Sequence, residues 1–262
     1  MIASPSNAQV KQVCALCKKS RYRKETGLFV VEGPKMFQEL PKDRIHQAYA
    51  TEKFAGDPAH ASMLRGIDRL RLVSEDVLKA MSDTQTPQGI LAVARMYRYS
   101  LADLKNRKGP ALLMILETIQ DPGNLGTILR AGEGAGITGV IMDNNTADIY
   151  NPKVIRSTMG SIYRVPFVST DDLPKTLASL KEQGIRLYAG DLEGRKSYDR
   201  EDYTLDTGFL IGNEARGLTA KTKAMADHLI RIPMAGQVES LNAAIASSIL
   251  MFEAARQRRE KS

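Results

Sequence analysis

From Ala111 onward, apolar runs of strand length alternate with helical segments, and this alternation limits the fold more than any other feature of the chain. The predicted strands are Ala111 to Leu116, Gly139 to Asp143, Arg164 to Val168, Arg186 to Ala189, Gly208 to Ile211 and Leu229 to Ile232. The predicted helices are Gly126 to Ala135, Pro152 to Met159, Leu173 to Gln183 and Leu241 to Arg259. This pattern is typical of α/β domains, in which helices cover both faces of a largely parallel sheet.

The first 95 residues predict a separate and smaller α/β unit. Its predicted helices are Asn7 to Lys19, Pro34 to Leu40 and Ser74 to Met81, and its predicted strands are Gly27 to Gly33, Ile45 to Ala50 and Gly89 to Arg95. Between Met96 and Pro110 the apolar pattern weakens, and Arg98, Lys105, Arg107 and Lys108 make the segment basic. We interpret residues 96–110 as a linker between two domains, 1–95 and 111–262.

The charge of the chain favours a polyanionic partner. Lys and Arg number 37 against 30 Asp and Glu, which gives a formal net charge of +7 and a pI near 9.3. This basic balance points mildly toward nucleic acid. The N-terminal sequence lacks the basic and apolar pattern of a signal peptide, and no apolar run is long enough to span a bilayer. We therefore expect a cytoplasmic protein with no membrane partner.

The only cysteines, Cys14 and Cys17, have the C-x-x-C spacing of many metal and redox sites. A zinc site needs a second pair of ligands, but the three histidines are scattered singly along the chain. Both cysteines also share helical spacing with Val10 and Val13. We predict that they are small buried residues on an apolar helix face, and we expect no bound metal.

A second motif, Gly134 to Gly139, matches the G-x-G-x-x-G pattern of dinucleotide-binding enzymes. In those enzymes the glycines turn a strand into a helix whose N-terminus faces the pyrophosphate. Here a helix precedes the glycines and a strand follows them. We interpret them as a helix exit and a tight connection to the next strand, which disfavours a nicotinamide-dependent oxidoreductase.

Three predicted strands end in glycine-containing polar loops, the position at which open α/β sheets bind ligands. The loops are Glu117 to Gly126, Gly212 to Leu218 and Pro233 to Asn242. Asn124, and either Ser240 or Asn242, could simply be helix N-caps. Arg130 stands about two turns into an otherwise apolar helix, where both a solvated face and a role in a pocket are open.

Together the three loops closely resemble, in order and spacing, the three signature motifs of the SpoU/TrmH branch of the SPOUT RNA methyltransferases. The resemblance implies an RNA 2′-O-ribose methyltransferase that uses S-adenosylmethionine and forms a homodimer whose interface borders the pocket. It also implies that the parallel-sheet domain contains a deep trefoil knot, which general topology rules would have rejected. The N-terminal unit resembles, more loosely, the family's ribosomal-protein-like substrate-binding domain.

The resemblance also implies roles for individual residues, and no motif position departs from the family's pattern. Arg130 corresponds to the principal catalytic residue, and the other catalytic positions are Asn124, Glu214, Ser240 and Asn242. The expected cofactor pocket comprises Ala189, Gly190, Gly212, Asn213, Ile232 and Leu241. In the N-terminal unit we expect Arg21 and Arg23 to contact RNA phosphates.

The chemistry at Arg130 and the identity of the RNA have alternatives. The family proposal assigns removal of the hydroxyl proton to the arginine, although a guanidinium stays charged in proteins. Arg130 is therefore either an unusual base or a cation that stabilises the developing alkoxide. The two-domain organisation resembles rRNA-modifying members, so 23S rRNA is favoured over tRNA. A non-catalytic RNA-binding protein on the same fold is the remaining alternative.

Overall fold

The computed structural model describes residues 1–104 and 109–261, which form two compact units. Unit 1 comprises Met1–Tyr97 and Asp148–Tyr163, and unit 2 comprises Arg98–Ala147 and Arg164–Ser262. The segment Asp148–Tyr163, expected in the C-terminal domain, thus packs with the N-terminal half of the chain. Of the predicted linker, residues 105–108, which include Lys105, Arg107 and Lys108, lie outside the described residues.

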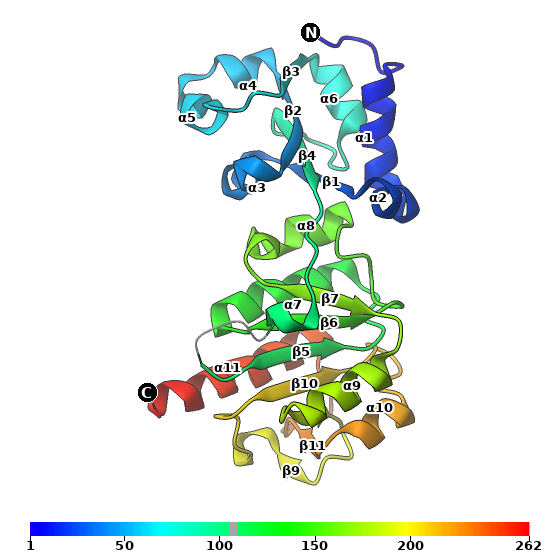
Figure 1. The fold of residues 1–262 in the computed structure, drawn as a ribbon, viewed down its shortest axis with the longest axis vertical. Helices are drawn as coiled ribbons and strands as arrows, with labels where there is room; N and C mark the ends of the chain where they lie inside the picture. The colour runs from blue at the N-terminus through cyan, green and yellow to red at the C-terminus, as the bar shows by residue number, and fades with distance from the viewer. Residues whose placement is uncertain (105–108, 262) are drawn as a thin grey trace. The chain divides into compact units, whose positions relative to one another are not determined.

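The sheet of unit 2 is parallel throughout, as predicted, and contains seven strands among the described residues (Figure 1). Its strand order is β7-β6-β5-β10-β8-β11-β9. The strands are β5 (Leu112–Leu116), β6 (Gly139–Asp143), β7 (Phe167–Thr170), β8 (Arg186–Gly190), β9 (Lys196–Ser197), β10 (Thr207–Ile211) and β11 (His228–Arg231). The sequence did not predict β9, because two residues are too few to show a pattern.

Helices cover both faces of this sheet (Figure 1). They are α7 (Pro122–Ala135), α9 (Leu173–Glu182), α10 (Ala220–Met225) and α11 (Ala243–Glu260), with the 3₁₀ turns η3 (Leu101–Leu104) and η5 (Tyr198–Arg200). Leucines of α9 pack on one face with buried side chains of β5, β8 and β10, and α7 and α11 lie together on the other. None of the described helices is long and apolar enough to cross a membrane. The trefoil knot stays a prediction.

Local sequence explains where α7 begins and ends. Asp121 is its N-cap and accepts a hydrogen bond from the backbone N–H of Asn124 at 2.9 Å, and Pro122 occupies the first turn, where proline is favoured. The predicted start at Gly126 was therefore late. Gly136 ends the helix in the left-handed region at φ 80°, and β6 follows from Gly139. The glycine motif is thus a helix exit, as predicted.

Unit 1 is built around a four-stranded sheet of order β1-β4-β2-β3, in which only the β2–β3 pair is parallel. Its strands are β1 (Leu28–Glu32), β2 (Ile45–Thr51), β3 (Leu70–Val73) and β4 (Ile90–Arg95). Its helices are α1 (Ala8–Lys18), α2 (Ser20–Thr26), α3 (Pro34–Glu39), α4 (Glu52–Gly56), α5 (Ala61–Leu64), α6 (Glu75–Met81) and α8 (Pro152–Thr158), with 3₁₀ turns η1 (Lys42–Arg44), η2 (Pro58–His60) and η4 (Ser161–Tyr163). Pro152 opens α8, as predicted, and Asn151 is its N-cap.

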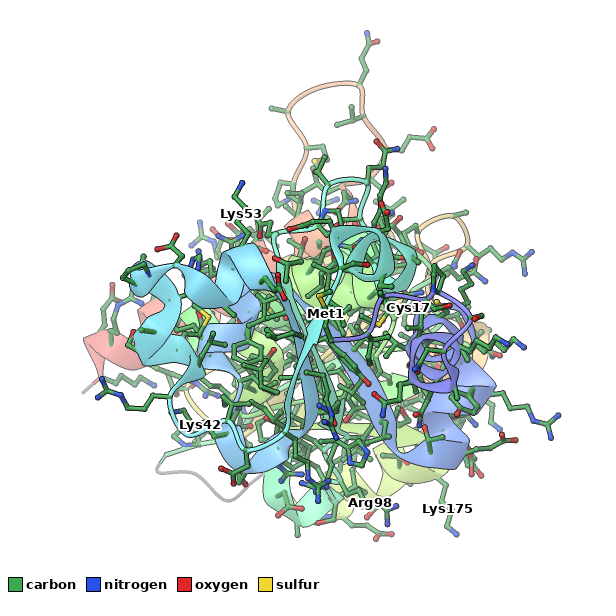
Figure 2. All side chains as sticks on the ribbon, turned by 90° about the horizontal axis from the view of Figure 1, so that it is seen from above. Met1, Cys17, Lys42, Lys53, Arg98 and Lys175 are labelled. Atoms are coloured by element: carbon green, nitrogen blue, oxygen red, sulfur yellow. The ribbon has the colours of Figure 1, made fainter. Side chains whose placement is uncertain are left out.

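The two cysteines lie on the apolar face of α1, as the helical spacing predicted, but both are partly and not fully buried. Cys14 and Cys17 pack against the core of unit 1, and their thiols donate to the carbonyls of Ala80 and Met81. Burial raises the pKa of the Cys17 thiol to about 12, so the thiol stays protonated. Figure 2 labels Cys17 on this helix and shows Lys53 of α4 projecting outward.

The prediction that Arg23 contacts RNA is wrong, because its side chain is buried inside unit 1. Arg23 is 2% exposed, and its guanidinium donates to Asp148 Oδ2 from Nε at 2.9 Å and from Nη2 at 2.5 Å. The Nη1 group donates to the carbonyls of Leu16 and Cys17 at 2.6 and 3.2 Å. Arg21 is different: its side chain is 90% exposed and pairs with Glu25.

Replacing Arg23 with alanine should destabilise the protein by about 3 kcal/mol, because it leaves Asp148 unpaired in a largely buried site. The matched change Arg21→Ala should alter stability by less than about 0.5 kcal/mol, since an exposed ion pair contributes little. Urea unfolding followed by circular dichroism measures both. Equal effects of the two substitutions would contradict the structural role of Arg23.

Candidate active site

The three polar loops meet at the carboxyl edge of the unit 2 sheet. The first follows β5, the second follows β10, and these two strands are direct neighbours. The third follows β11, which is separated from β10 only by β8. Because all these strands are parallel, their carboxyl ends lie at one edge and their loops converge there. The fold thus assembles segments that are far apart in the sequence.

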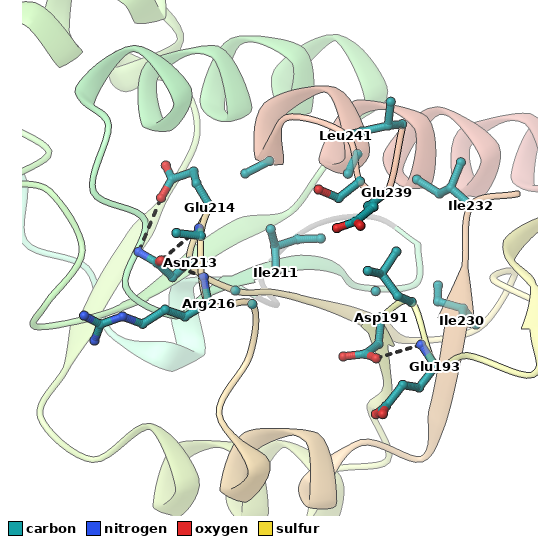
Figure 3. A pocket seen from close by; sticks show the side chains of 18 of the residues that line it. Asp191, Glu193, Ile211, Asn213, Glu214, Arg216, Ile230, Ile232, Glu239 and Leu241 are labelled. Atoms are coloured by element: carbon teal, nitrogen blue, oxygen red, sulfur yellow. Dashed lines mark hydrogen bonds between the residues drawn. The ribbon is translucent and has the colours of Figure 1, made fainter. Parts of the chain in front are cut away.

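A cavity of about 440 Å³ opens at this edge (Figure 3). Its walls come from the loops after β8, β10 and β11 and from the start of α11. The apolar part of the lining comprises Leu192, Ile211, Ile230, Ile232, Met234, Leu241 and Leu250, and the charged part comprises Asp191, Glu193, Glu214, Arg216, Lys223 and Glu239. An apolar pocket with a few converging polar groups is a typical small-molecule site.

Most of the predicted cofactor residues line this cavity. They are Gly190, Gly212, Asn213, Ile232 and Leu241, together with Ser240 and Glu214 from the predicted catalytic set. Ala189 was also expected there, but it is fully buried within β8 and does not line the cavity. The structure therefore brings the second and third motifs together around one cavity.

Glu214 connects the second motif to the first. Its carboxylate accepts hydrogen bonds from the Asn124 side chain at 2.9 Å and from the backbone N–H groups of Gln120 and Asp121, each at 3.3 Å. Asn124 was considered as a simple N-cap, but Asp121 has that position. The side chain of Asn124 is instead used to bind Glu214.

Asn242 connects the third motif to the same network. Its side-chain amide donates to Asn124 Oδ1 at 2.9 Å, and its own Oδ1 accepts from the N–H groups of Ala244 and Ile245 as the N-cap of α11. One chain of hydrogen bonds therefore runs from Asn242 through Asn124 to Glu214. It fixes the three loops relative to one another.

The second loop is unusually tight. A side chain on Gly212 would place its Cβ 2.2 Å from the carbonyl carbon of Gly217, so only glycine fits there. Asn213 and Gly217 exchange two backbone hydrogen bonds of 3.1 and 2.8 Å. The Asn213 side chain donates to the carbonyl of Thr118 at 2.9 Å, which is a further connection to the first loop.

Asp143 and Thr118 support the first loop and were not predicted from the sequence. Thr118 has φ 60°, a conformation that β-branched residues rarely adopt. Asp143, the last residue of β6, accepts hydrogen bonds from the Thr118 N–H at 2.9 Å and from its hydroxyl at 2.8 Å. The position of Asp143 at the end of a predicted strand could have indicated its role from the sequence. Nothing in the sequence indicates the strained backbone of Thr118.

Lys223 and the loop after β8 form a further part of the cavity that the sequence did not predict. Lys223 Nζ lies 2.5 Å from Asp191 and 3.6 Å from Glu193, and all three residues line the cavity. Hydrogen bonding to Asp191 raises the pKa of Lys223, so the lysine remains charged. It thereby offsets the negative charge of the two carboxylates on this wall.

The structure does not bring Arg130 into this cavity. Arg130 is exposed on α7, outside the residues that line the cavity, and its guanidinium forms no hydrogen bond or ion pair within residues 1–104 and 109–261. Its helix nevertheless begins within the first of the three loops, directly after Asp121. In the single chain the guanidinium of Arg130 is therefore accessible to solvent.

The protonation of Glu214 couples this network to pH. Burial by itself raises the pKa of Glu214, but hydrogen bonds from Asn124 and from nearby backbone N–H groups outweigh it and hold the pKa below its usual range. A lowered pKa in the folded state means that the ionised carboxylate stabilises the fold above the ordinary carboxyl pKa. This contribution is lost as the pH falls through the lowered value.

Glu214→Gln should therefore lower the free energy of unfolding at neutral pH by less than about 1 kcal/mol, since the group is solvent-exposed. The difference from the unsubstituted protein should vanish at acidic pH. Urea unfolding at both pH values measures it. In an Asn124→Ala background the difference at neutral pH should shrink, and a difference that is independent of pH would contradict the network.

Comparison with known proteins agrees with this geometry. The SpoU rRNA Methylase family model matches residues 111–252, and the MRM3-like substrate binding domain model matches residues 7–92. The 23S rRNA (guanosine(2553)-2'-O)-methyltransferase RlmP of Bacillus subtilis strain 168 is 32% identical over 253 residues, which cover 96% of this chain and 97% of the relative.

Two solved structures with bound cofactor are also similar. The SpoU methyltransferase AviRb from Streptomyces viridochromogenes, in complex with AdoMet, superposes with a TM-score of 0.88 at 27% identity and covers 97% of this chain and 98% of its own. An AdoMet-bound rRNA methyltransferase from Sinorhizobium meliloti gives a TM-score of 0.83 at 31% identity, with 97% of each chain covered. The protein therefore belongs to the SpoU rRNA methylase family, and its N-terminal unit is an MRM3-like substrate-binding domain.

Proposed function

We propose that this protein transfers a methyl group from S-adenosylmethionine to a ribose 2′-hydroxyl of ribosomal RNA. The observation that carries this proposal is the cavity at the carboxyl edge of the sheet, where hydrogen bonds join the three family motifs. Ribosomal RNA is favoured over tRNA because the relative from Bacillus subtilis, which matches this chain over 97% of its own length, is named a 23S rRNA 2'-O-methyltransferase. An rRNA substrate also supports the expected cytoplasmic location.

The cavity residues fit S-adenosylmethionine. Isoleucine and leucine side chains offer apolar surface for an adenine ring, and Gly190 and Gly212 allow a ligand to approach the backbone. Asp191 and Glu193 add carboxylates that suit hydroxyl or ammonium groups. When bound, the cofactor would supply a methyl group on a positively charged sulfur. Ser240, Ile232 and Leu241 would then border the cofactor from the third motif.

The residues of the chain have two tasks in this reaction. Glu214, Asn124 and Asn242 hold the loops so that the hydroxyl and the methyl group align. This alignment accelerates the reaction, because the reacting groups no longer have to find the correct geometry by chance. We assign to Arg130 the stabilisation of the 2′-oxygen as the hydroxyl proton passes to solvent, because a guanidinium that remains cationic cannot accept that proton itself. This choice favours the cationic alternative over Arg130 as a base.

We further propose that the protein is a homodimer, paired through α7 and α11. Ile245 and Phe252 are 51% and 47% exposed and lie one heptad apart, on one side of α11. A Cβ at Gly134 would lie 3.7 Å from the Phe252 ring, so α7 borders the same surface. Arg130 precedes Gly134 by one turn, and a second copy on this surface would therefore lie next to Arg130.

The proposed activity is tested with labelled S-adenosylmethionine and total RNA from a strain that lacks the protein. Label should appear in rRNA, and nuclease digestion should locate it on a ribose 2′-oxygen. Label in tRNA alone would replace the proposed substrate. Label on a base, or none at all, would contradict the proposed reaction.

Arg130→Ala should lower the turnover number by at least about 100-fold, because it removes the charge that stabilises the oxyanion. Binding of S-adenosylmethionine, measured by calorimetry, should stay within about twofold, since Arg130 does not line the cavity. Turnover close to that of the unsubstituted protein would exclude Arg130 as a catalytic residue.

Phe252→Glu should convert the dimer into a monomer, because it places a charge in the proposed apolar interface. Light scattering coupled to gel filtration measures the mass. Leu72→Glu is the matched control: Leu72 is 37% exposed but lies on β3 of unit 1, so this variant should remain dimeric. A monomeric unsubstituted protein, or a dimeric Phe252→Glu variant, would contradict this interface.

A further inference from the structure

Arg216 lies in the same tight loop as Glu214, but the network of the active site does not use its side chain. In Figure 3 the side chain of Arg216 extends away from Ile211 and Asp191, toward the outside of the site. Arg216 is exposed, and its guanidinium forms no hydrogen bond or ion pair with any residue in the described part of the chain. The cation is therefore available to a ligand.

The backbone of Arg216 is held firmly although its side chain is not. Asn213 Oδ1 accepts hydrogen bonds from the N–H groups of Ala215 and Arg216 at 3.0 and 3.1 Å. The paired backbone hydrogen bonds between Asn213 and Gly217 close the loop on both sides of it. The Cα atom of Arg216 is thus held in a fixed position, two residues after Glu214, next to the place where the proposed reaction would occur.

The cavity lining carries more carboxylates than cations, so an outward-facing arginine matters for the approach of an anionic ligand. Four carboxylates line the cavity, those of Asp191, Glu193, Glu214 and Glu239, against two cations. One of these cations, Lys223, is already paired with Asp191 and Glu193. An RNA backbone that approaches this rim is repelled by the carboxylates unless a cation compensates for them. Among the lining residues, Arg216 is the cation whose charge no ion pair offsets.

We propose that Arg216 binds a phosphodiester of the substrate RNA next to the target ribose and thereby positions the 2′-hydroxyl at the cavity mouth. A guanidinium suits this role because it is permanently charged and its paired N–H groups match two phosphate oxygens. The inference rests on the proposed function, since it assumes that RNA is the substrate of this site. It makes Arg216, which lines the rim of the cavity, a positioning residue for RNA and not a ligand of the cofactor.

The test compares Arg216→Gln with the unsubstituted protein, using rRNA from a strain that lacks the protein. The KM for RNA should rise about tenfold, as expected for loss of a charged hydrogen bond. The salt dependence of RNA binding, measured by filter retention, should become shallower by about 0.7 to 0.9 in log–log slope, the value for one phosphate contact. The Kd for S-adenosylmethionine should not change.

Two further variants sharpen the test. Arg216→Lys keeps the charge but loses the paired donors, so it should restore the salt slope and only part of the affinity. Arg186→Gln is the matched control, because Arg186 is also exposed on unit 2 but is the first residue of β8, at the edge of the parallel sheet opposite the cavity. It should leave the KM and the salt slope close to those of the unsubstituted protein.

The outcomes separate this inference from the proposed function. An unchanged KM and salt slope in Arg216→Gln would overturn the phosphate contact. A weaker Kd for S-adenosylmethionine in that variant would also overturn it, because Arg216 would then bind the cofactor's carboxylate. If the unsubstituted protein binds RNA with a salt slope that depends on Arg216 but transfers no methyl group, the contact is supported and the proposed reaction fails.

Discussion

The carboxylate of Glu214 is the point at which the separate loops of the active site become one structure. It receives hydrogen bonds from a side chain and two backbone N–H groups of the first loop, and Asn124 passes the connection on to Asn242 at the start of α11. Loops alone would be too mobile to shape a cavity. With this network, the ends of β5, β10 and β11 hold a single arrangement.

That network depends in turn on the sheet and on strain near it. Parallel pairing of β5 with β10 brings their carboxyl ends together, and Asp143 at the end of the neighbouring β6 holds Thr118 at a positive φ. Such strained residues persist only where their surroundings fix them, and they occur often at functional sites. The loop that precedes Asn124 is therefore held rigidly by these hydrogen bonds.

Most strands and helices of unit 2 could be predicted from the sequence, because the spacing of apolar residues indicates which side chains are buried. The predicted strand Gly139 to Asp143 has the bounds of β6, and the cavity is lined by two of the three predicted loops, those of the second and third motifs. Arg23 shows the limit, since the sequence does not reveal that Asp148, more than a hundred residues away, will pair with it. The direction of the Arg130 side chain likewise depends on how α7 packs against α11, which local patterns do not specify.

The central claim is that the cavity framed by Gly212, Ile232 and Leu241 binds the methyl donor and joins the three motifs in one site. A crystal structure of the protein with S-adenosylmethionine tests it most directly. The account predicts the cofactor within this cavity, bordered by all three residues, with its methyl group on the side of Glu214 and Asn124. A cofactor bound elsewhere on the chain, or no binding at saturating concentration, would contradict it.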